Sequence, residues 1–133
     1  MSWQLFTDGG SRGNPGPGAC AYVLYDPAGN LQEKCGKYLG KVTNNQAEYE
    51  GIIEGLKAAK QNRVEELGCL LDSELVVRQI NGTYKIKDPG LKPKTLEVFK
   101  LIQNFKTVTF NYIPREQNKE ADKLVNETLD QYT

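Results

Sequence analysis

The chain has 133 residues, of which 38% are hydrophobic and 26% charged, a composition that is ordinary for one globular domain. Lysine and arginine together number 17, as do aspartate and glutamate, so the overall charge does not indicate a nucleic-acid-binding protein. The sequence contains no histidine, which excludes histidine triads, histidine zinc sites and histidine acid–base catalysis. Any chemistry must therefore use carboxylates, lysines, hydroxyls or a metal bound by oxygen.

The first 60 residues predict three strands and a helix. The strands are expected at residues 3–7, 19–26 and 31–39, and the turn-forming residues between the last two favour a hairpin. Trp3, at the start of the first strand, is interpreted as a core residue. The helix has Thr43 or Asn44 as its N-cap, and its apolar residues follow helical spacing over residues 48–60.

The rest of the chain alternates between strands and helices. In order, we expect a strand at 65–71, a short helix at 73–80, a loop at 83–93, a helix at 94–105, a strand at 107–113 and a helix at 116–132. Alternation of this kind after a hairpin indicates an α/β fold, with helices packed on the faces of a mixed sheet.

Composition and pattern also set expectations for organisation and location. No linker or repeat divides residues 1–133, so we expect a single domain, and the start at Met1 favours an independent protein. No apolar run approaches the roughly 20 residues of a membrane span, and no signal peptide is recognisable, which favours a cytoplasmic protein with no membrane segment. No long apolar stripe is left over, which favours a monomer. Cys20, Cys35 and Cys69 have no metal-ligand spacing and are expected to be buried free thiols.

Four carboxylates stand out by their positions. Asp8 and Asp72 lie at predicted strand ends, where loops open and reactive groups are commonly placed. Glu48 and Asp122 each lie at one end of an apolar helical stripe, which directs them toward the sheet. Any one of them alone reads as a surface or capping residue. Four converging carboxylates repel one another and need divalent cations, and Mg²⁺ or Mn²⁺ suits such oxygen ligands.

Four segments resemble, in the same order, the motifs of type 1 ribonuclease H, the ribonuclease HI family, in its compact form without a basic protrusion. They are residues 8–18, 43–48, 71–76 and 114–124, and together they extend over nearly the whole chain. The resemblance implies a ribonuclease H-like fold, with a five-stranded mixed sheet of order 3-2-1-4-5 flanked by helices. It implies an endoribonuclease that cuts the RNA strand of RNA–DNA hybrids and leaves 5′-phosphate and 3′-hydroxyl ends.

The resemblance also implies roles for individual residues. The carboxylates Asp8, Glu48, Asp72 and Asp122 would hold two ions, with Asp8 between them; one ion would activate the attacking water, and the other would stabilise the leaving 3′-oxygen. The implied substrate contacts are Asn14, Asn44 and Asn45 to the minor groove of the hybrid, Thr43 to a phosphate of the DNA strand, and Lys41 as an assisting residue. Only RNA presents a 2′-hydroxyl in that groove.

The sequence departs from the family pattern in three places. The loop before the fourth motif lacks the histidine that many members carry, and Arg115 or Glu116 could partly substitute for it. Glu74 stands where many members have an amide, and we keep it outside the catalytic set. The lysines of the 83–93 region and the start of the next helix form either a solvated face or a reduced phosphate-contacting patch, with Tyr84 able to lie against a sugar; they are Lys85, Lys87, Lys92 and Lys94.

Three other functions remain open at this point. The chain could be a nuclease or transferase of the same fold that acts on other nucleic acids, double-stranded RNA included. It could be an inert hybrid-binding module, whose usual mark would be the loss of one of the acids. It could also be a domain of a larger assembly. Cleavage assays on hybrid, RNA duplex and DNA duplex separate the first possibility from the expected one.

Overall fold

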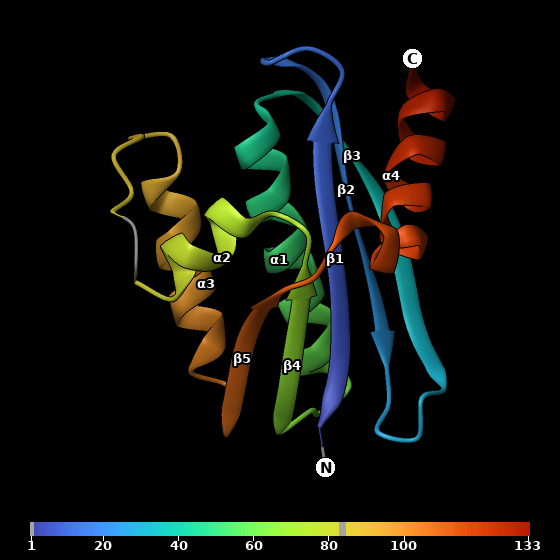
Figure 1. Cartoon of the computed structure of the whole chain (residues 1–133), viewed down its shortest axis with the longest axis vertical. Helices are drawn as coiled ribbons and strands as arrows, with labels where there is room; N and C mark the ends of the chain where they lie inside the picture. Colours follow the sequence, from blue (N-terminus) through green and yellow to red (C-terminus); the bar gives the residue numbers. More distant parts are fainter. Residues whose placement is uncertain (1, 83–84) are drawn as a thin grey trace.

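A computed structural model describes residues 2–82 and 85–133 and places five strands of that part in one sheet (Figure 1). The strands are β1 (Trp3–Ser11), β2 (Gly16–Tyr25), β3 (Leu31–Val42), β4 (Glu66–Leu71) and β5 (Thr107–Tyr112). Their order is β3-β2-β1-β4-β5, with β1 to β3 antiparallel and with β4 and β5 parallel to β1. The expected order and the mixed character of the sheet are both confirmed.

Helices cover both faces of the sheet. They are α1 (Asn44–Gln61), α2 (Glu74–Ile80), α3 (Lys92–Ile102) and α4 (Lys119–Tyr132). The first three share one large apolar core with the sheet, in which Leu5, Ile52 and Leu56 have no exposed surface. Trp3 packs against this core, as predicted. The last helix lies on the other face, over a smaller cluster that includes Ala21 and Leu129 (Figure 1).

Glycines allow α1 to lie directly on the backbone of β1. A Cβ atom on Gly9 would lie 2.2 Å from the carbonyl oxygen of Ala47 in α1. A Cβ atom on Gly51 would lie 2.7 Å from the carbonyl oxygen of Asp8 in β1. With no side chain between them at these points, the helix and the strand hold Asp8 and the first turns of α1 at backbone contact distance.

Several element boundaries differ from the sequence-based expectation. The first strand continues past Thr7 to Ser11, because its antiparallel pairing with β2 extends to Ser11 and Gly18. Helix α3 begins at Lys92 rather than at residue 94, since Pro93 fits the first turn, where no backbone N–H is needed. Helix α4 begins at Lys119, and a 3₁₀ turn (Arg115–Gln117) precedes it.

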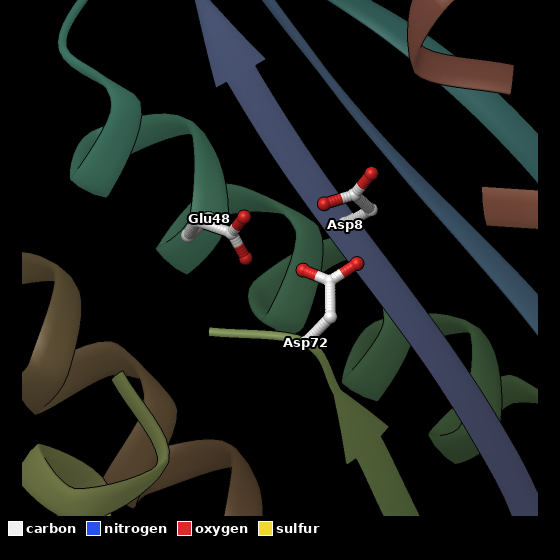
Figure 2. A group of neighbouring side chains, drawn as sticks. All are labelled: Asp8, Glu48 and Asp72. Carbon is white, nitrogen blue, oxygen red and sulfur yellow. The ribbon is translucent and has the colours of Figure 1, made fainter. Parts of the chain in front are cut away.

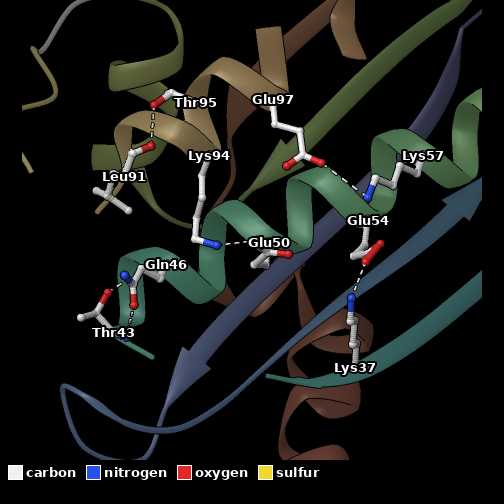
Figure 3. A network of polar contacts seen from close by, with 10 residues as sticks. All are labelled: Lys37, Thr43, Gln46, Glu50, Glu54, Lys57, Leu91, Lys94, Thr95 and Glu97. Carbon is white, nitrogen blue, oxygen red and sulfur yellow. Dashed lines mark hydrogen bonds and ion pairs between the residues drawn. The ribbon is translucent and has the colours of Figure 1, made fainter. Parts of the chain in front are cut away.

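Ion pairs fasten α1 to its neighbours on two sides (Figure 3). They are Lys94–Glu50 at 2.5 Å and Lys57–Glu97 at 3.5 Å, both to α3, and Lys37–Glu54 at 2.7 Å, to β3. Lys94 was grouped above with the loop lysines, but its ammonium is engaged by Glu50 in a half-buried pair. It therefore belongs to the packing of α3 on α1. Tyr84 lies outside the described residues.

Two other expectations concern cysteines and membranes. All three cysteines are free thiols, and Cys20 and Cys69 are buried as expected, whereas Cys35 is exposed on β3. Cys35 lies in a strand that is itself half exposed, so that its side chain is not enclosed by a helix. Within residues 2–82 and 85–133, no helix combines the length and the apolar character needed to cross a membrane.

Candidate active site

The register of two parallel strands brings Asp8 and Asp72 together. The paired residues of β1 and β4 end at Thr7 and Leu71, and Asp8 and Asp72 are the next residue of each chain segment. Since parallel strands run in register, the residues after the last pair are neighbours. From this point β1 continues without a partner on its β4 side, which leaves a free edge beside Asp8.

A helix cap sets the position of the third acid, Glu48. The Thr43 hydroxyl accepts the N–H of Gln46 (3.1 Å), and the Gln46 side chain accepts the N–H of Thr43 (2.9 Å), a capping box that fixes the start of α1. Glu48 then lies in the second turn, directly after Ala47, the residue that contacts Gly9. Glu48 is only 8% exposed, and its side chain points toward Asp8 and Asp72 (Figure 2).

The three carboxylates converge. One oxygen from each of Asp8, Glu48 and Asp72 lies within 4.8 Å of the other two, and Figure 2 shows the side chains extending from α1, β1 and the end of β4 toward a common point. Of the four acids that were expected to converge, the structure brings these three together. Asp8 and Glu48 are 40 positions apart in sequence, and Glu48 and Asp72 are 24 apart, so only the tertiary fold assembles them.

Burial and mutual repulsion disfavour the charged forms of these acids. Burial, and next the negative charge of Asp72, raises the pKa of Asp8 to about 7. Burial, and next the charge of Asp8, raises the pKa of Glu48 well above its ordinary value. Burial also raises the pKa of Asp72, against a hydrogen bond from Asn118 that lowers it. A cation between the three carboxylates would remove this penalty.

The donor set fits a hard divalent cation. Among the described residues, Oε2 of Glu48 is buried and has no hydrogen-bond partner, although buried carboxylate oxygens are normally paired. Three carboxylates without a nitrogen or sulfur ligand suit Mg²⁺ or Mn²⁺. A cation held between the three acids would pair with this oxygen.

Asp122 lies near this group but outside its tightest part. It lines the same depression as the other three acids, from the first turn of α4. Its carboxylate lies 3.5 Å from the guanidinium of Arg115. Arg115 is 78% exposed, so this pair stabilises the fold little and the guanidinium is free to turn toward a ligand.

The expected substrate residues divide into a joined pair and three separate side chains. Oδ1 of Asn44 accepts the backbone N–H of Ser11 (2.8 Å), and Oδ1 of Asn14 accepts the backbone N–H of Asn44 (3.1 Å). These bonds tie the β1–β2 loop to the start of α1, and Asn44 borders the depression that holds the acids. Thr43 serves as the helix cap, Asn45 is half-buried beside it, and Lys41 is exposed near the end of β3.

Two further residues complete the account of the site. Glu74, excluded from the catalytic set above, pairs with Arg78 one turn along α2 at 2.7 Å. Asn118 was not among the site residues expected from the sequence, yet it is 1% exposed and its amide reaches Asp72 (3.2 Å). The available sequence signal was its position four residues before Asp122 on the same face of α4.

Comparison with known proteins supports this description of the fold. The model of the family described as "Reverse transcriptase-like" matches residues 6–128. Ribonuclease HI of Halobacterium salinarum is 38% identical over 127 residues, which cover 96% of this chain and 64% of that protein. The bifunctional protein Rv2228c of Mycobacterium tuberculosis is 39% identical over 132 residues, or 98% of this chain and 36% of that protein. The chain thus spans between about a third and two thirds of the length of these curated relatives.

Solved structures agree with the sequence relatives. The crystal structure of RNase H1 from Halobacterium salinarum has a TM-score of 0.95 at 37% identity and covers 98% of this chain and 99% of that one. LC11-RNase H1 from compost, in complex with an RNA/DNA hybrid, has a TM-score of 0.92 at 39% identity and covers 98% of both chains. The chain belongs to the ribonuclease H family, in the branch that contains ribonuclease HI.

Proposed function

We propose that the chain is an endoribonuclease that hydrolyses the RNA strand of RNA–DNA hybrids and leaves 5′-phosphate and 3′-hydroxyl ends. The observation that carries the proposal is the convergence of Asp8, Glu48 and Asp72 within 4.8 Å, in a fold with a TM-score of 0.92 to an RNase H1 crystallised with a hybrid. Residues 1–133 act as one catalytic domain, a proposal supported by the family match over residues 6–128.

Four carboxylates are the proposed ligands of two divalent ions, either Mg²⁺ or Mn²⁺; they are Asp8, Glu48, Asp72 and Asp122. The unpaired Oε2 of Glu48 and the raised pKa values support this assignment. When bound, such ions supply the positive charge that activates water and stabilises a leaving oxygen. The protein's own contribution is rigidity, because β1, β4 and α1 hold the acids at fixed positions before substrate arrives.

Side chains beside the acids are proposed to orient the hybrid. Asn14, Asn44 and Asn45 face its minor groove, where the 2′-hydroxyl distinguishes RNA from DNA. Thr43 and Lys41 hold a phosphate of the DNA strand. The position of Asn44 at the edge of the acidic depression supports this arrangement, since minor-groove contact and scissile phosphate must lie close together.

Arg115 is proposed to replace, in part, the loop histidine that the chain lacks. Its exposed guanidinium beside Asp122 supports a role in holding a phosphate near the acids. Glu116 follows it in the same 3₁₀ turn, but no contact with the acids supports a role for that residue. An Arg115→Ala variant with unchanged turnover would exclude the role of the guanidinium.

A cleavage assay with end-labelled substrates tests the proposed function. The expected result is cutting of the RNA strand of a hybrid in Mg²⁺ or Mn²⁺ and complete loss of cutting in chelator. A phosphatase should remove the 5′-phosphate of the products, whereas an enzyme specific for 3′-phosphates should leave them unchanged. Equal cutting of an RNA duplex would extend the substrate class to double-stranded RNA. Hybrid binding without cutting in either metal would instead support an inert binding module, and no binding would reject both.

A monomeric state and a cytoplasmic location remain predictions. Sedimentation equilibrium measures the first directly. Exposed apolar side chains on α3, Leu96 and Phe99, are one turn apart and would be the first place to look if a dimer were found.

A further inference from the structure

Asn118 occupies an N-cap position without capping its helix. An asparagine at the N-cap normally accepts a backbone N–H from the first turn with its side-chain oxygen, which stabilises a helix by about 1 kcal/mol. The Asn118 side chain makes no such bond at the start of α4. It turns instead toward the sheet, where it is 1% exposed. The side chain is therefore held by contacts other than those of its own helix.

Those contacts join the segments that carry three of the four acids. Nδ2 of Asn118 donates to the carbonyl oxygen of Thr7 (2.9 Å), the residue before Asp8 in β1. The same nitrogen donates to Oδ2 of Asp72 (3.2 Å). The backbone carbonyl of Asn118 accepts the N–H of Asp122 (3.1 Å), the first helical bond that orients this acid.

The orientation of the amide follows from its partners. A backbone carbonyl can only accept, so the group that faces Thr7 must be the NH₂ of Asn118. Its oxygen is left buried without a partner among the described residues. An unpaired buried oxygen costs free energy, which indicates that the bonds to Thr7 and Asp72 determine how the side chain lies.

We propose that Asn118 is a positioning residue of the catalytic centre, which fixes the carboxylate of Asp72 against β1 and sets the distance of Asp122 from the other acids. It does not touch the substrate. A hydrogen bond to one oxygen of a carboxylate fixes the plane of the group, and thus the direction of the second oxygen. Partners of this kind commonly change metal affinity or activity by about 10–100-fold when they are removed. The inference rests on the proposed function.

Two variants separate positioning from helix capping. Asn118→Ser supplies a good N-cap for α4 but is too short to replace both amide bonds, so the melting temperature is expected to stay equal or rise. Its affinity for Mn²⁺, measured by calorimetry on metal-free protein, is expected to fall about tenfold or more. Its kcat falls likewise, while KM for the hybrid stays unchanged. Asn118→Leu keeps the buried volume without the donor and is expected to show the same losses.

A matched control removes a similar amide bond elsewhere. The amide of Asn81, at the end of α2, donates to the carbonyl oxygen of Phe110 in β5 (3.1 Å). Asn81→Ser is expected to change the melting temperature but neither Mn²⁺ affinity nor kcat. Wild-type protein that neither binds Mn²⁺ nor cuts a hybrid would contradict the proposed function itself. Active wild type together with folded Asn118 variants of unchanged Mn²⁺ affinity and kcat would overturn only the positioning role.

Discussion

Asn14 and Asn44 each have a free NH₂ group to offer a substrate, whereas their side-chain oxygens already accept hydrogen bonds within the chain. The side-chain oxygens of both residues accept backbone N–H groups, of Asn44 and of Ser11. Because a backbone N–H can only donate, the orientation of each amide is fixed, and each NH₂ group is free of hydrogen bonds within the described residues. In the proposed contact with a hybrid, both residues would therefore act as donors, to the 2′-hydroxyl oxygen or to the acceptor atoms of base edges in the minor groove.

Replacing Asn44 by aspartate tests this donor role. Asn44→Asp keeps an oxygen for the N–H of Ser11 but removes the donor, so the melting temperature should stay near that of the wild type. KM for the hybrid should rise about tenfold, which corresponds to one lost hydrogen bond of roughly 1.4 kcal/mol. The rise should persist at high salt, where repulsion between charges is screened. Asn104→Asp adds the same charge after α3 and should leave KM unchanged; an unchanged KM in Asn44→Asp would contradict the donor role.

Asp8 should make the metal-free protein sensitive to pH. Its pKa is raised from 3.8 to about 7 in the folded chain, so the folded state binds a proton that the unfolded state has already lost. Stability then falls as pH rises between about 4 and 7, because the folded state must ionise a buried acid. In chelator, the melting temperature of the wild type should fall across this window. Asp8→Asn should flatten the fall and abolish cutting; an equally steep fall would place the titrating group elsewhere.

Single residues of the site differ in how far the sequence reveals them. Asp8, Glu48 and Asp72 stand next to strand or helix ends within recognisable motifs, and their convergence could be anticipated. The bonds of Asn118 and the contact of Arg115 with Asp122 could not. They depend on how the first turn of α4 meets the sheet, which is decided by packing between segments that are distant in sequence.

At the scale of elements, the contact between α1 and β1 requires a residue without a side chain at Gly51. Alanine in a helix is normally better than glycine by about 1 kcal/mol. Here the added Cβ would lie 2.7 Å from the carbonyl oxygen of Asp8, a backbone atom that cannot move aside alone. Gly51→Ala should therefore lower the melting temperature, with overpacking of about 1–3 kcal/mol outweighing the gain in helix propensity.

A neighbouring glycine supplies the control for that experiment. The Cβ of Gly55→Ala would lie 2.8 Å from a methyl group of Leu5, the end of a side chain that can change rotamer. Its loss of stability in thermal unfolding should be smaller. Gly51→Ala should also weaken Mn²⁺ binding, because a displaced α1 carries Glu48 with it. Equal melting temperatures of Gly51→Ala and Gly55→Ala would contradict this prediction and show that α1 can move away from β1 without loss of stability.

Periodicity located every α-helix and strand of the described chain, but not all of their ends. Gly9 and Gly10 look like a turn in sequence, whereas they continue β1, since pairing with β2 and the close approach of α1 both favour them there. The 3₁₀ turn before α4 was likewise taken as part of the helix, because Glu116 fits a helical start. Local propensity depends only on residues that are near in sequence. It therefore misplaces the ends of strands and helices that are fixed by tertiary contacts.

At the scale of the whole molecule, a net charge of zero means that binding to a hybrid must depend on local patches. Lys85, Lys87 and Lys92 are exposed around the start of α3. If they contact phosphates, the logarithm of the affinity should fall with the logarithm of the salt concentration, by roughly 0.7 to 0.9 units of slope for each contact. Their joint replacement by alanine should flatten the slope. Lys94→Ala, which breaks the pair with Glu50, should lower stability and leave the slope unchanged.

Divalent ions should stabilise the whole fold, because the carboxylates that would bind them are buried close together and repel one another without a cation. Asp8 and Glu48 are buried acids of raised pKa, and a ligand that binds only the folded state stabilises it by mass action, by about 2.7 kcal/mol at one hundred times its Kd. Added Mg²⁺ should therefore raise the melting temperature of the wild type, measured by calorimetry against NaCl of equal ionic strength. In Asp8→Asn the rise should shrink or disappear, while stability in chelator stays equal or increases. A variant that unfolds in chelator would show that Asp8 holds the fold together rather than an ion.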